Sequence, residues 1–158
     1  MNSRWIKCAV LGAALVLGQA TVMAQGTPNF APTTQLGGQS LQLNGQGVRY
    51  RAVVPVYEMG LYTTQKVTTP EQLLKLSGPK RASFVALRDF PSEQMGLSLV
   101  RGMRDNADPA QAAAVAGYMD KLGRIFSTEK KIAAGQTFTL DYVPGKGTAF
   151  LLNGVQKG

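Results

Sequence analysis

The chain has 158 residues, carries a formal charge of +8, and contains one cysteine and no histidine. This length fits one domain, and the ordinary hydrophobic content argues against both wholesale disorder and several membrane-spanning helices. Without histidine the chain cannot form a Ser-His-Asp or Cys-His triad, a histidine-ligated zinc or haem site, or a histidine general base. The composition therefore excludes several large classes of hydrolase and metalloenzyme.

Residues 1–24 have the pattern of a secretory signal peptide. Arg4 and Lys7 give a positive start, residues 9–18 are apolar, and Ala24 ends a stretch that suits cleavage. The apolar stretch is shorter than the roughly 20 residues that span a membrane, so an uncleaved anchor is the less favoured alternative. We expect a periplasmic or secreted protein with no stable membrane anchor. Cleavage would also remove Cys8, the only cysteine.

Basic residues in the rest of the chain are scattered instead of clustered. No basic run with interleaved aromatic residues occurs, although such a run is typical of nucleic-acid binding. We interpret the basic side chains as mostly solvated surface and expect no nucleic-acid partner.

The first predicted elements are strands. Residues 25–39, rich in Gly, Pro, Thr and Gln, suggest a flexible N-terminal segment or an edge segment, and the domain is expected to span 40–158. Asn44-Gly45 is typical of a tight hairpin turn between a strand around Leu41 and a returning strand over 48–57. Residues 61–67 have strand composition, and Gly60 before them suggests a bulge or a close backbone approach.

Helices are predicted in the middle of the chain. Thr69 precedes Pro70 and is expected to cap a short helix that ends near Gly78, after which 82–90 has the composition of a buried strand. Two longer helices follow, the first capped by Ser92 and the second opened by Asp108-Pro109, each with apolar residues at helical spacing.

The last part of the chain again predicts strands. Apolar and polar residues alternate over 137–142, a Pro-Gly turn follows, and 148–152 returns as the second strand of a hairpin. Asn153-Gly154 indicates another tight turn, and because only four residues remain we expect the domain to be incomplete at its C-terminus. Strands on both sides of a helical pair favour an α+β fold, with an antiparallel sheet covered on one face by helices.

Three polar sets are candidates for a site, each with a simpler explanation. Arg49 follows a Gly-rich stretch and could hold an oxyanion, or it is a surface arginine. Tyr57, with Tyr62 and Tyr50, could donate a hydroxyl in an apolar cavity, although half-buried strand tyrosines are common. Asn106, among charged residues at a helix end, fits a site or simple solvation of that end.

Cofactor motifs are absent from the sequence. Gly45-Gln46-Gly47 lacks the third glycine of a dinucleotide fingerprint, and no Gly-Lys-Ser/Thr phosphate loop occurs. No pair of carboxylates is picked out by its context, and oxygen-only metal binding has no support. We expect no cofactor and no metal.

Several segments together resemble one family. They are the Leu-Asn-Gly-Gln-Gly-Val-Arg run at 43–49, the Gly-Leu-Tyr piece at 60–62, Asn106, and the Asp-Tyr-Val-Pro-Gly-Lys-Gly-Thr run at 141–148. In this order they are similar to the bacterial exported chalcone isomerase-like family. The resemblance implies an open-faced β-sandwich, an antiparallel sheet covered by helices.

The resemblance also implies roles for three residues. In plant chalcone isomerases an arginine orients the substrate oxyanion, with a threonine, a tyrosine and an asparagine around it. Arg49 corresponds to that arginine and Asn106 to that asparagine, whereas Tyr57 stands where the enzymes carry the threonine. A bulky phenol there would crowd the cavity used for ring closure.

The resemblance leaves three functions open. Non-catalytic relatives with this fold bind fatty acids, so the first hypothesis is a monomer that binds a small amphipathic or acyl ligand through Arg49, Tyr57 and Asn106. The alternative is an isomerase or intramolecular lyase acting on a phenolic or enone substrate. A third hypothesis is a periplasmic structural or interaction module whose cleft is vestigial and filled by side chains.

Overall fold

The computed structural model describes residues 30–158, with side chains for all of these except 109–115. The predicted signal peptide lies outside the described residues. In spatial order, the main antiparallel sheet consists of β1 (Thr33–Leu36), β2 (Gln39–Arg51), β3 (Val54–Thr63), β4 (Lys80–Ala86), β7 (Thr137–Val143), β8 (Gly147–Leu152) and β9 (Val155–Gln156). The remaining elements are α1 (Pro70–Lys75), α2 (Ser92–Asn106), α3 (Pro109–Ser127) and a small ladder between β5 (Phe90–Pro91) and β6 (Lys131–Ile132).

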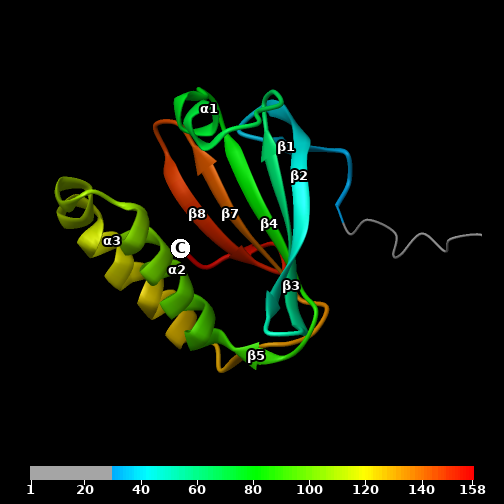
Figure 1. The fold of residues 1–158 in the computed structure, drawn as a ribbon, viewed down its shortest axis with the longest axis vertical. Helices are drawn as coiled ribbons and strands as arrows, with labels where there is room; N and C mark the ends of the chain where they lie inside the picture. Colours follow the sequence, from blue (N-terminus) through cyan, green and yellow to red (C-terminus); the bar gives the residue numbers. More distant parts are fainter. Residues whose placement is uncertain (1–29) are drawn as a thin grey trace, which may run out of the picture.

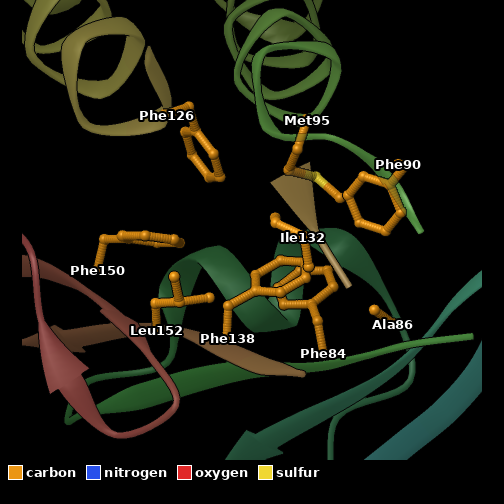
Figure 2. Close-up of a cluster of buried hydrophobic side chains, with 9 residues drawn as sticks. All are labelled: Phe84, Ala86, Phe90, Met95, Phe126, Ile132, Phe138, Phe150 and Leu152. Carbon is orange, nitrogen blue, oxygen red and sulfur yellow. The ribbon is translucent and has the colours of Figure 1, made fainter. Parts of the chain in front are cut away.

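The predicted α+β class is confirmed. Helices α2 and α3 form an antiparallel pair beside the sheet (Figure 1). Figure 2 shows how they are fixed there: Met95 of α2 and Phe126 of α3 point toward a cluster of buried side chains from the sheet and from β6. The rings of Phe84 and Phe138 stack at the centre of this core, with centroids 4.5 Å apart. Burial of such aromatic side chains is the main stabilising term available to a domain of this size.

A smaller buried cluster lies on the opposite face of β3. Phe30, Leu41 and Tyr62 form it, and a Cβ built on Gly60 would stand 2.8 Å from Cγ of Phe30. The predicted close approach at Gly60 is therefore confirmed. The Tyr62 hydroxyl donates to the carbonyl oxygen of Ala31 at 2.9 Å, and burial raises the pKa of this tyrosine above its ordinary value.

The segment before Ser40 belongs to the sheet. Residues 33–36 pair with β2 as an edge strand, and Gly37-Gly38 makes the turn between them with φ values of 58° and 77°. The expected start of the domain at Ser40 is therefore too late. Residues 25–39 were predicted to be either a flexible segment or an edge segment, and the edge segment is the alternative that fits residues 33–36. The polar composition of this segment lacks the alternation of apolar residues that usually indicates a strand.

The predicted turn at Asn44-Gly45 is wrong. Strand β2 runs straight through these residues with a bulge, because Leu43 pairs with Tyr62 and Gly45 with Leu61. The Asn44 amide explains the bulge: its Oδ1 accepts from the Val67 N–H at 2.8 Å and its Nδ2 donates to the Val67 carbonyl at 3.1 Å. The side chain thus replaces a strand partner, and the chain reverses instead at residues 52–53.

Of the predicted helix caps at Thr69 and Ser92, the first is confirmed and the second is wrong. The Thr69 hydroxyl accepts from the Gln72 N–H at 3.2 Å, so the predicted cap of α1 is confirmed. Ser92 does not cap α2: the N-cap is Pro91, which has no side-chain bond, and Ser92 is buried.

The predicted turns of the last hairpins are confirmed, with Asn153 in the left-handed region at φ 49° and β9 following it.

An ion pair holds the curl of the sheet. Arg81 of β4 donates from Nε and Nη2 to the two carboxylate oxygens of Asp141 on β7, at 2.7 and 2.6 Å, and from Nη1 to Thr34 Oγ1 at 2.8 Å. Thr34 lies on β1, three strands from β4 in the sheet order, so the sheet is curled enough to bring β1 over β4. The hydrogen bonds with Asp141 raise the pKa of Arg81 above the already high value of an ordinary arginine. This cluster therefore links three strands through one guanidinium.

We expect Asp141→Asn to lower the free energy of unfolding by about 2 kcal/mol, because it removes the anionic partner of the partly buried Arg81 guanidinium. Urea denaturation would measure the change. The control is Glu129→Gln, which breaks the solvent-exposed pair with Lys157 and should cost less than about 1 kcal/mol. Equal effects of the two variants would show that the Arg81 cluster does not hold the curl.

Candidate functional site

A groove lies along β2 and β3, on the side of the sheet that carries the helices. Its volume is about 430 Å³. The lining residues are Gly45, Gln46, Gly47, Val48, Arg49, Tyr57, Met59 and Leu61. On β3, alternate residues line the groove, as expected for side chains that share one face of a strand.

Two glycines make the groove hollow. Gly45 pairs with Leu61 and Gly47 with Met59, so each glycine lies opposite an apolar side chain on the same face. A Cβ built on either glycine would meet no heavy atom of residues 30–158 within 4 Å. The floor of the groove is therefore bare backbone on β2 and apolar side chains on β3.

Arg49 and Tyr57 are brought together at one end of the groove. They are directly opposite in the β2–β3 register, so their side chains leave the same face of the sheet. The Tyr57 ring meets Phe84 edge-on with centroids 5.3 Å apart, which anchors it against the main core. The phenol therefore borders both the core and the groove.

The Arg49 guanidinium is available for a ligand. Its side chain is exposed, and no hydrogen bond or ion pair joins it to any side chain that the structure describes. A guanidinium offers five N–H donors and suits bidentate bonds with a carboxylate or another oxyanion. One end of an apolar groove thus carries an unpaired cation, which is an arrangement suited to an amphipathic anion.

Asn106 is not at this site. It lies at the end of α2, is exposed, and donates from Nδ2 to the Gly102 carbonyl at 2.8 Å. The other two tyrosines are also elsewhere: Tyr62 is buried on the opposite face, and Tyr50 lies past Arg49, 56% exposed. Of the three predicted ligand-binding residues, the structure brings only Arg49 and Tyr57 together.

Sequence reasoning missed the apolar part of the groove. Met59 and Leu61 continue the face of Tyr57 at intervals of two, and Gly45 and Gly47 repeat the same interval on β2. That shared alternation was visible in the sequence. It was hidden by the wrong turn at Asn44-Gly45, which placed the glycines outside a strand.

The described residues contain neither a cluster of metal ligands nor a membrane-spanning helix. Among residues 30–158, no three His, Cys, Asp or Glu side chains gather as metal ligands would. No helix within the described part of the chain is both long and apolar enough to cross a membrane.

The fold and the groove together define an α+β protein with a curled antiparallel sheet, partly covered by helices and open along β2 and β3. The model of the chalcone isomerase-like family matches residues 23–158, so the chain belongs to the chalcone isomerase-like family. The crystal structure of a fatty-acid binding protein from Arabidopsis thaliana is similar, with a TM-score of 0.59 and 13% sequence identity over 80% of each chain. At this identity the likeness shows a shared fold. No curated protein sequence matches the chain.

We expect Gly47→Leu to fill the groove without disturbing the fold, because the added atoms point into open space and glycine is unfavourable inside a strand. The free energy of unfolding should change by less than about 0.5 kcal/mol. Binding of the fluorescent dye anilinonaphthalene sulfonate, followed by its emission, should fall.

The contrasting variant is Gly60→Ala on β3. Its Cβ would collide with Phe30 on the opposite face, so it should lower stability by about 1–3 kcal/mol while leaving the groove open. Unchanged dye binding by Gly47→Leu would show that the groove does not take apolar ligands.

Proposed function

We propose that the protein is exported and binds a small amphipathic or acyl ligand in the β2–β3 groove, as a monomer. Arg49 holds the ligand's carboxylate, Tyr57 supplies a second donor, and the acyl chain lies over Gly47 and Gly45 against Met59 and Leu61. The observation that carries this proposal is the unpaired Arg49 guanidinium at one end of an apolar groove. Asn106 has no part in it, because its side chain is engaged with its own helix.

The dimensions of the groove suit an extended chain. From Gly45 to Arg49, β2 rises about 13 Å at roughly 3.3 Å per residue. Each methylene removed from water contributes about 0.8 kcal/mol when fully buried, so affinity should increase with chain length until the groove is filled. Because the groove is open, part of the ligand stays in contact with water and the gain per methylene is smaller.

The comparisons support the choice of ligand class. The Arabidopsis thaliana protein with a similar fold is described as a fatty-acid binding protein. A carboxylate on a hydrocarbon chain also matches the order of features along this groove, with the cation at one end and apolar contacts after it. Burying a carboxylate beside a guanidinium compensates its desolvation better than burial beside apolar residues alone.

We expect Arg49→Gln to weaken dodecanoate binding about tenfold, because a charge-assisted hydrogen bond contributes on the order of 1.5 kcal/mol. Dodecanol, with the same chain and no carboxylate, should bind the variant and the wild type equally. Isothermal titration calorimetry would measure both ligands. The control is Arg101→Gln, an exposed arginine on α2 outside the groove. Undiminished dodecanoate binding by Arg49→Gln would contradict the proposal.

The alternative function is an isomerase or lyase reaction on a phenolic or enone substrate. Membership of the chalcone isomerase-like family and an arginine in the groove favour it. Loss of chalcone absorbance would measure it. Turnover above the spontaneous rate by the wild type, abolished in Arg49→Gln, would favour the enzyme over the binding protein.

A further inference from the structure

The tip of the β2–β3 hairpin exposes apolar side chains. Residues 52–53 form the turn, and Val53 is 89% exposed, the highest exposure among the large hydrophobic residues described. Next to it, Val54 is 41% and Tyr50 is 56% exposed. Scattered single apolar residues on a surface are ordinary, but these three belong to one projecting hairpin end.

Local stability does not explain this turn. Two-residue hairpin turns favour Asn-Gly or Asp-Gly, because both central residues often need positive φ. Here Ala52 takes φ 52°, a left-handed conformation that is strained for a residue with a Cβ. The tip therefore carries apolar residues where polar residues and glycine would be more stable and more soluble.

Two arginines lie at or beside the tip. Arg51 is the last residue of β2, and Arg88 is brought alongside because the Leu87 N–H donates to the Val56 carbonyl at 2.9 Å. The nearest acid on that loop, Asp89, is already paired: it accepts from Lys131 Nζ at 2.7 Å and from the Ala134 N–H at 2.9 Å.

The other acid of this region is Glu58, on β3 opposite Val48. Its neighbour Tyr57 faces the groove, so Glu58 points to the opposite face of the strand. It has a partner of its own. Among the residues that the structure describes, the surroundings of the tip are therefore predominantly positive.

We propose that the β2–β3 tip docks on an anionic lipid surface. Val53, Val54 and Tyr50 enter the interface between headgroups and acyl chains, and Arg51 and Arg88 contact the headgroup phosphates. Apolar and aromatic residues flanked by cations are the combination that binds such interfaces. Since Arg49 of the groove comes directly before Tyr50 on the same strand, the groove opens beside the docked tip. Docking would thus place a ligand site next to the membrane, but it does not require that the groove bind acyl ligands.

The test uses the full chain and vesicle flotation. The wild type should float with vesicles of equimolar phosphatidylglycerol and phosphatidylcholine, and bind vesicles of phosphatidylcholine alone at least tenfold more weakly. The variant Val53→Asp should weaken binding to the anionic vesicles about tenfold. The double variant Arg51→Gln/Arg88→Gln should weaken it more than tenfold, since each cation near such a surface contributes about 1 kcal/mol. Added salt should release the wild type.

Two matched controls lie away from the tip. Leu74→Asp changes an apolar residue of α1 that is 82% exposed, and Lys146→Gln removes a charge from the β7–β8 turn at the other end of the sheet. Both should bind anionic vesicles as the wild type does. Dodecanoate binding without vesicles should be unchanged in Val53→Asp, so a failure of docking is distinguishable from a failure of the groove.

Three results would overturn docking on lipid. The first is equal binding of the wild type to both kinds of vesicle, or to neither. The second is a loss of binding in the controls that matches the loss in Val53→Asp. The third is dimerisation of the wild type that Val53→Asp abolishes in the absence of lipid, because the tip would then be an interface between two copies of the chain.

Discussion

The contact of Arg81 with Asp141 and Thr34 is the constraint on which the shape of the sheet depends. One guanidinium joins strands β4, β7 and β1, and strand β1 reaches it only because the sheet curls. The approach of Phe30 to the bare backbone of Gly60 acts on the same face. Because a carboxylate and a hydroxyl oxygen satisfy the partly buried Arg81 guanidinium, the curl is held by polar contacts as well as by apolar burial.

The groove follows from where the helices pack. Met95 and Phe126 fix the helix pair over the aromatic side chains of β4, β7 and β8, so within residues 30–158 no helix covers the face of β2 (Figure 1). An ordinary strand there would expose side chains that fill the space. Gly45 and Gly47 leave it open. Tyr57 marks the boundary because its ring packs against the core, while Met59 and Leu61 further along β3 line the groove. The site is thus a consequence of partial coverage combined with two missing side chains.

Much of the local structure was predictable from single residues. Thr69 and Pro70 identify the start of α1, and Asn153-Gly154 identifies a left-handed turn, because these residue types satisfy backbone requirements that few others meet. Asn44-Gly45 shows the limit of such reasoning. The same dipeptide serves a turn or a bulge, and the choice is made by the distant backbone of Val67, which the local sequence does not contain.

The sequence by itself determined which residue types a candidate site could use: a chain without histidine leaves arginine and tyrosine as the main polar chemistry, and the Gly-rich stretch ahead of Arg49 pointed to β2. Only the tertiary structure decided which candidates meet. Cross-strand register sets Arg49 opposite Tyr57, while Asn106 is left at the far end of a helix, bonded to Gly102. Register and helix placement depend on contacts between residues far apart in the chain, so no local pattern could fix them.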